Sequence, residues 1–242
     1  MTSVAQGAPK SVSVKPLKVF SQSSSAEAIV ANSKAIFTYE NIMGLSADIK
    51  VRAFDFAGTE IWSKTVDSGL DELATAMAID SQGTLWLVGN IAIAAQPESA
   101  TAATEALNPD GIEVENIQPL RADMKNISVW QINTTGEIIG QSSIATVALI
   151  DAISVSSSGL SILASRDNEP FLLTFSQGKF SKELKLGTAK TKLSAITRSS
   201  DGTTYLFGSS SETLGGKKLV GRVDGILIKV AKTGSITSVV RS

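Results

Sequence analysis

The chain has 242 residues, 43% of them hydrophobic, with 22 Lys and Arg against 23 Asp and Glu, and it contains neither Cys nor His. These absences exclude disulfides, thiolate or imidazole metal sites, Cys nucleophiles and the Ser-His-Asp triad. No apolar run reaches the roughly 18 residues that a membrane-spanning helix needs, and the N-terminal residues lack the apolar core of a signal peptide.

The N-terminal part of the chain is expected to be a flexible tail over residues 1–15, followed by a strand at 16–22 (PLKVFSQ). Each later repeat unit is preceded by the outer strand of the unit before it. Residues 16–22 precede the first unit in the same way, so we expect them to be the outer strand of another blade.

A unit of two hairpins then recurs four times along the chain. In each unit a short apolar run, a polar turn and a second apolar run are followed by a second pair of the same kind. Such recurrence is typical of β-propellers. It predicts an all-β propeller of four-stranded antiparallel blades in a repeat array over 16–242, with blades at about 27–66, 73–144, 150–186 and 193–242. Four blades and one extra N-terminal strand predict an incomplete or open ring that exposes strand edges.

The turns repeat as regularly as the strands. Glycine recurs at one point of the first hairpin in three units and of the second hairpin in all four: Gly83, Gly159 and Gly202, then Gly58, Gly136, Gly178 and Gly234. Glycine adopts positive φ without a Cβ penalty, which tight turns require. The first unit carries Lys34 instead and is expected to turn differently. Asp80, Asp151 and Asp201 are interpreted as turn formers whose side chains bond the local backbone.

Four side chains share a place in the repeat, three residues after the turn glycine or its counterpart: Phe37, Trp86, Ile162 and Tyr205. We expect them to be equivalent packing positions between blades. For Trp86 an aromatic cage is the alternative, but its apolar neighbours favour core packing.

The fourth unit is similar to the bacterial β-propeller repeat of SBBP type. Its residues match both halves of that repeat: Gly202, Tyr205 and Gly208, then Asp224, Gly225, Ile226, Leu227, Lys229 and Gly234. Unit two keeps Gly83, Trp86 and Gly89 but has Asn126 where the Asp-led strand begins. The other units keep mainly the turns and the apolar periodicity. The resemblance implies a bacterial surface or secreted protein in which the propeller is a binding or spacer module without a reaction of its own.

The units differ in the loop between their second and third strands. The longest is an insertion at 91–126, and a second long loop covers 210–224. In a propeller both loops project from one face, the face that usually binds ligands. The first loop is acidic and the second is basic. Candidate binding residues are therefore Asp110, Glu113, Glu115, Arg121, Asp123, Lys217, Lys218 and Arg222.

Three interpretations of the acidic loop remain open. Asn108, Asp110, Glu113 and Glu115 are hard oxygen ligands suited to Ca²⁺, although residues 108–111 are also a strong β-turn signal. Glu113 and Glu115 could form a catalytic carboxylate pair. The favoured interpretation is a solvated recognition loop with no cofactor.

Charge separates along the chain, because residues 1–175 hold 10 of the basic and 19 of the acidic residues. The basic C-terminal part lacks the interleaved aromatics of a nucleic-acid surface, and its lysines fit exposed outer strands. We therefore expect a non-enzymatic module that recognises a protein or polysaccharide through its loop face. The alternatives are a calcium-dependent hydrolase or lactonase and a structural spacer in a longer surface protein.

Overall fold

The computed structural model describes residues 25–44, 46–93 and 124–242, and these form four antiparallel sheets. Sheet 1 is β1–β2–β3–β4, at Ala28–Ala31, Ile36–Met43, Ala47–Phe54 and Glu60–Val66. Sheet 2 is β5–β6–β7–β8, at Glu72–Ile79, Leu85–Ile91, Asn126–Ile132 and Ile138–Ala145. The strand that was expected at 16–22 and the tail at 1–15 lie outside the described residues.

Sheets 3 and 4 complete the array. Sheet 3 is β9–β10–β11 with its fourth strand divided in two, at Leu149–Ser156, Gly159–Arg166, Glu169–Ser176, Lys179–Phe180 (β12) and Leu184–Lys185 (β13). Sheet 4 is β14–β15–β16–β17, at Thr191–Arg198, Thr204–Ser210, Asp224–Val230 and Ile236–Arg241.

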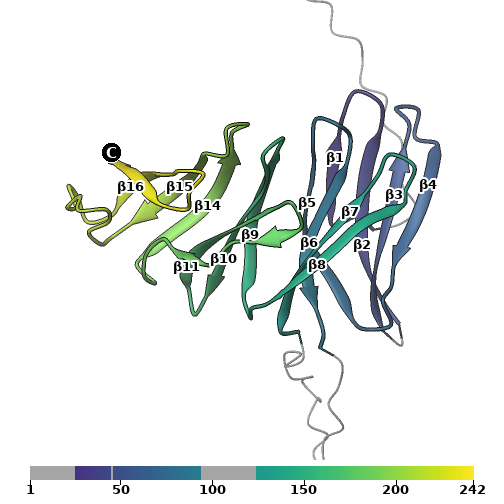
Figure 1. The fold of residues 1–242 in the computed structure, drawn as a ribbon, viewed down its shortest axis with the longest axis horizontal. Helices are drawn as coiled ribbons and strands as arrows, with labels where there is room; N and C mark the ends of the chain where they lie inside the picture. Colours follow the sequence, from purple (N-terminus) through teal and green to yellow (C-terminus); the bar gives the residue numbers. More distant parts are fainter. Residues whose placement is uncertain (1–24, 45, 94–123) are drawn as a thin grey trace, which may run out of the picture.

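The sheets stand face to face in chain order, and sheet 4 ends the row with the C-terminus (Figure 1). Sheet 4 does not return to sheet 1, so the described residues form an open array. The predicted all-β fold of four-stranded antiparallel blades is confirmed as propeller-like. Among the described residues there is no helix, and so none with the length and apolar character to cross a membrane.

The turn predictions hold because local chemistry decides them. All seven turn glycines have positive φ, from 73° at Gly178 to 114° at Gly159. Asp80 bonds its own turn, with Oδ1 accepting from Gln82 N and Thr84 N at 2.9 Å. Asp201 likewise accepts from Thr203 N at 2.8 Å. Asp151 was wrongly assigned to this group, since it lies within β9 at a β-bulge and accepts from Ser165 Oγ at 3.3 Å.

Two glycines of the repeat have a different role, because they let the first two strands of a sheet approach closely. A Cβ on Gly89 would lie 1.9 Å from the carbonyl oxygen of Leu73, and one on Gly208 would lie 1.9 Å from that of Lys192. Both glycines face a bulge in the first strand of the sheet. Any side chain there would displace the strand pair.

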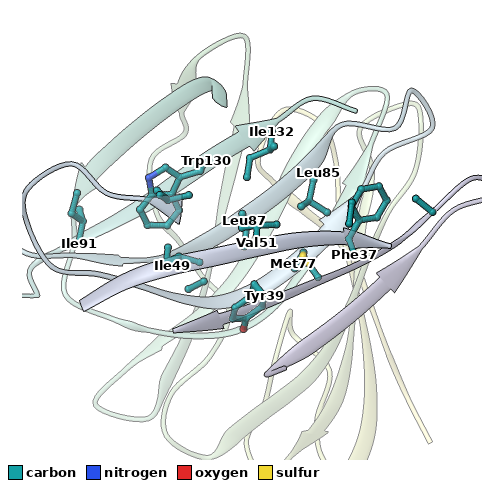
Figure 2. Packing of buried hydrophobic residues seen from close by; sticks show 14 residues of the cluster. Phe37, Tyr39, Ile49, Val51, Met77, Leu85, Leu87, Ile91, Trp130 and Ile132 are labelled. Atoms are coloured by element: carbon teal, nitrogen blue, oxygen red, sulfur yellow. The ribbon is translucent and has the colours of Figure 1, made fainter. Parts of the chain in front are cut away.

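The core is a series of three apolar clusters, each between one sheet and the next. The first packs sheet 1 against sheet 2, and Figure 2 shows Tyr39 and Val51 facing Leu87 and Trp130. The second joins sheets 2 and 3 and the third joins sheets 3 and 4. Each middle sheet is therefore buried on both faces, which explains the continuous apolar runs of its strands.

The predicted equivalence of position is correct for Phe37, Trp86 and Tyr205 and wrong for Ile162. The predicted packing between sheets is correct for Phe37, Trp86 and Ile162 and wrong for Tyr205. Phe37, Trp86 and Tyr205 each occupy the second cross-strand pair from the hairpin turn, pairing with Val30, Ala78 and Thr197. Ile162 faces the opposite way, into the cluster with sheet 2, because β9 and β10 connect through two residues and the other hairpins through four or five.

Phe37, Trp86 and Tyr205 lie on corresponding faces of their sheets, but they differ in burial because only the first two are covered by a following sheet of the described array. Phe37 and Trp86 are buried between sheets, and Trp86 packs edge-on to Phe175 at 6.2 Å, so core packing is correct for it. Tyr205 is half-exposed because no sheet among the described residues follows sheet 4.

Candidate functional site

The predicted binding residues fall into two groups. Five of them lie in the long insertion and are outside the described residues: Asp110, Glu113, Glu115, Arg121 and Asp123. The other three, Lys217, Lys218 and Arg222, are exposed on the β15–β16 connection. The structure therefore places only the basic group, on sheet 4.

Asp224 orders the connection that carries these cations. It is the first residue of β16, and its carboxylate accepts from Val220 N at 2.9 Å and from Gly221 N at 2.8 Å. The same carboxylate pairs with Arg241 at 3.0 Å, and both side chains are buried. These backbone donors and the guanidinium hold the pKa of Asp224 below its ordinary value. Asp224, the first residue of the Asp-led strand in the repeat motif, thus fixes the β15–β16 connection to the start of β16 and to Arg241.

Gly215 and Gly216, just before the lysines, form a tight turn. Both have positive φ, and Leu214 and Lys217 exchange backbone hydrogen bonds of 3.2 and 2.8 Å across them. The turn leaves Lys217 and Lys218 exposed, where their ammonium groups can attract an anionic ligand and donate hydrogen bonds to it.

A groove of about 630 Å³ lies at the opposite end of sheets 2 and 3, among their hairpin turns. Its walls include Asp80, Trp86 and residues 156–159. Asp80 Oδ2 accepts from Trp86 Nε1 at 2.9 Å while its other oxygen bonds the turn. The hydroxyl oxygens of Ser156 and Ser158 lie 2.8 Å from each other and 3.0 and 3.1 Å from Ser199 O, so their two protons are shared among these three oxygens. These polar groups are occupied by the fold, and Lys232 is the charged side chain of the groove for which no such bond is seen.

Three carboxylates converge where sheet 1 meets sheet 2. Asp48 lies near the start of β3, Asp67 directly follows β4, and Glu72 begins β5. One oxygen from each lies within 4.8 Å of the others. Burial, together with the charges of Asp48 and Asp67, raises the pKa of Glu72. Sequence reasoning missed this cluster, although the acidic run at 67–72 (DSGLDE) is a visible signal.

One row of side chains recurs across all four sheets. Each row begins with Ala in the first strand and continues straight across the second and third: Ala28–Tyr39–Val51, Ala76–Val88–Val129, Ala152–Leu163–Leu172 and Ala195–Phe207–Leu227. In the first three sheets the row packs beneath the next sheet. We call this the covered row.

In sheet 4 the same row is uncovered. Phe207 is 42% exposed, Leu227 is half-buried, and Val240 extends the row onto β17 at 54% exposure. The opposite face of sheet 4, which carries Leu206 and Ile228, is buried against sheet 3. Sheet 4 therefore has one face built into the core and one apolar row facing solvent.

Comparison with known proteins gives likeness of fold alone. No family model and no curated protein matches the chain. Among solved structures it resembles a luciferin-regenerating enzyme, at 9% identity and TM-score 0.45, covering 88% of this chain and 61% of that one. It also resembles an ACO/RPE65 chimera, at 9% identity and TM-score 0.43, covering 86% and 46%.

A third match is BBS1N in complex with ARL6DN, at 14% identity and TM-score 0.31, covering 87% of this chain and 76% of that one. The chain thus spans about half to two thirds of the first two matching chains. At such identities the matches say nothing of activity. The described residues form a propeller-like array of four antiparallel sheets.

Proposed function

We propose that this protein is a non-enzymatic scaffold that binds a second copy of itself through the outer face of sheet 4. The observation that carries the proposal is that the covered row, which is buried in sheets 1, 2 and 3, is exposed in sheet 4. Three copies of it lie under a neighbouring sheet, and the fourth, with Phe207 and Leu227, faces solvent. A contiguous apolar surface that faces solvent is a feature of interaction sites.

The outer face of sheet 1 is a poor match for this surface. Glu40 and Arg52 form an ion pair of 2.7 Å there, and Lys50 lies opposite Glu40 in the ladder. The two paired side chains are each 15% exposed, and packing Phe207 over them and Lys50 would remove their remaining contact with water without giving the charges new partners, which is costly. Head-to-tail closure of two chains is therefore disfavoured.

The remaining apolar sheet face on the described part of the chain is that of sheet 4 itself. Two copies related by a two-fold axis would present the same row to each other, an isologous contact that closes as a dimer. Lys229 flanks the row and lies 5.8 Å from the Tyr205 ring centre, so its charge has an aromatic neighbour.

Several features support a binding role over a catalytic one. The chain has no His and no Cys. The carboxylate in the groove, Asp80, is fully engaged in its turn and with Trp86. The likeness of the fourth unit to SBBP repeats supports a bacterial surface or secreted protein. The exposed Lys217, Lys218 and Arg222 would add attraction for an acidic protein or polysaccharide.

Sedimentation velocity on the purified chain tests the dimer. We expect the sedimentation coefficient to rise with concentration through the micromolar range and Phe207→Asp to abolish the rise. Ser63→Asp is the matched control, because Ser63 lies on the exposed outer face of sheet 1 opposite Arg52 and leaves sheet 4 intact. A wild-type chain that stays monomeric at every concentration, or a Phe207→Asp variant that still associates, would overturn the proposal.

A further inference from the structure

The carboxylate cluster at the junction of sheets 1 and 2 joins parts of the chain that lie on two sheets. Asp48 comes from sheet 1, Glu72 from sheet 2, and Asp67 from the link between them. Their oxygens approach within 4.8 Å. Three like charges at that spacing repel one another unless a proton or a cation neutralises them.

Glu72 is the buried member of the cluster. Its side chain is fully buried, and one oxygen, Oε1, accepts from Ser68 N at 3.0 Å and from Ser68 Oγ. The other oxygen, Oε2, is buried without a hydrogen-bond partner. Among the described residues two further buried polar atoms lack partners, Trp130 Nε1 and Arg241 Nε, but both are donors. Glu72 Oε2 is thus the buried acceptor that still needs a positive group.

We propose that Asp48, Asp67 and Glu72 bind a calcium ion. Carboxylate oxygens are hard ligands, and Ca²⁺ binds them at roughly 2.3–2.6 Å, so two of its ligands can be up to about 5 Å apart. The three oxygens lie within 4.8 Å of one another, which is inside this limit. Mg²⁺ demands near-octahedral geometry and loses its water ligands reluctantly, whereas Ca²⁺ accepts irregular sets of carboxylate oxygens, so this cluster favours Ca²⁺.

The three carboxylates differ in burial in a way that suits a calcium site. Glu72 is buried, Asp48 is half-buried and Asp67 is exposed, which gives the ion a path to solvent and leaves room for water ligands. The link that carries Asp67 is already held, since Asp67 Oδ1 accepts from Gly69 N at 2.8 Å. The ion would tie sheet 1 to sheet 2 through this link, which is independent of the proposed dimer.

Calorimetric titration of CaCl₂ into chelator-treated full-length protein tests the site. We expect one binding event with a Kd of about 10⁻⁵–10⁻³ M, a higher Tm in millimolar Ca²⁺, and at least about tenfold weaker binding of MgCl₂. Glu72→Gln and Asp67→Asn should each abolish the heat and the Tm shift. Glu137→Gln, in the exposed β7–β8 turn at the far end of sheet 2, should keep both.

Asp67→Asn keeps the test decisive if Glu72→Gln fails to fold, because Asp67 is exposed and its turn bond can be kept by Asn. Two results would overturn the proposal. One is a wild-type protein without heat or Tm shift at about 10 mM Ca²⁺, which would mean that a proton neutralises the cluster. The other is a response to Ca²⁺ that is equal in wild type and in both variants.

Discussion

The two end sheets of the array share a fold but differ in their outer faces. Sheet 1 carries the ion pair of Glu40 and Arg52, largely buried, on its outer face, while sheet 4 presents Phe207 and Val240 to solvent. A sheet that ends a stack normally needs one polar face, and sheet 1 satisfies this requirement. Sheet 4 instead repeats the covered row of the inner sheets. The difference teaches that, among the described residues, sheet 1 has a charged outer face and sheet 4 an apolar one, the face through which we propose that the protein binds a second copy.

The largest expected effect compares a covered and an uncovered member of the row. Leu163 is fully buried between sheets 3 and 4, so Leu163→Ala should lower the free energy of unfolding by about 2–5 kcal/mol. Phe207→Ala, at the same row position in sheet 4, should cost the monomer only about 1–2 kcal/mol because the side chain is already 42% exposed. Urea denaturation at a dilute, monomeric concentration measures both. Equal losses would show that the face of sheet 4 is covered within the monomer.

Substitutions at Gly89 and Gly208 test whether the first two strands approach equally closely in sheets 2 and 4, although one face of sheet 4 is exposed and both faces of sheet 2 are buried. Either Gly→Ala change should cost about 1–3 kcal/mol, because the new Cβ would meet a backbone carbonyl oxygen. Gly44→Ala is the control, since the nearest atom to its Cβ is a carbonyl oxygen at 3.6 Å. Thermal unfolding of the three variants measures the effect. A loss at Gly89 without one at Gly208 would break the geometric equivalence.

The smallest expected effect is on the Tm at low pH and depends on Asp224 in sheet 4. The pKa of Asp224 is lowered by the backbone donors Val220 and Gly221 and by Arg241. A group whose pKa is lower in the folded state stabilises the protein above its unfolded value, about 3.9 for Asp, and this contribution is lost as pH falls through the folded value. The Tm of the wild type should therefore fall more steeply below about pH 4 than that of Asp224→Asn. Parallel curves in circular dichroism melts would contradict the role of Asp224 in fixing the β15–β16 connection.

Much of the fold could be predicted because its signals are local. Turn glycines, Asx residues and apolar runs predicted the hairpins, since φ at Gly83 or a bond from Asp80 to its own turn depends on a few adjacent residues. Ile162 was misassigned because the β9–β10 hairpin is shorter, and a one-residue change of register reverses the side of the sheet. The division of the fourth strand of sheet 3 had no sequence signal that we used.

The candidate sites were less accessible to the same reasoning. Lys217, Lys218 and Arg222 were expected on an exposed loop and lie on one, but their role remains a proposal. The cluster of Asp48, Asp67 and Glu72 was missed because it forms only when two sheets pack and bring the start of β3 against the β4–β5 link.

The sequence by itself determined that this protein is an array of four antiparallel hairpin pairs, because alternation and turn chemistry act over a few residues. Only the tertiary structure decided which face of each sheet is covered. The row Ala195–Phe207–Leu227 reads in sequence like its three counterparts, and it differs from them solely in having no sheet above it in the described array. Burial of that kind depends on contacts between residues far apart in the chain, which local patterns do not encode.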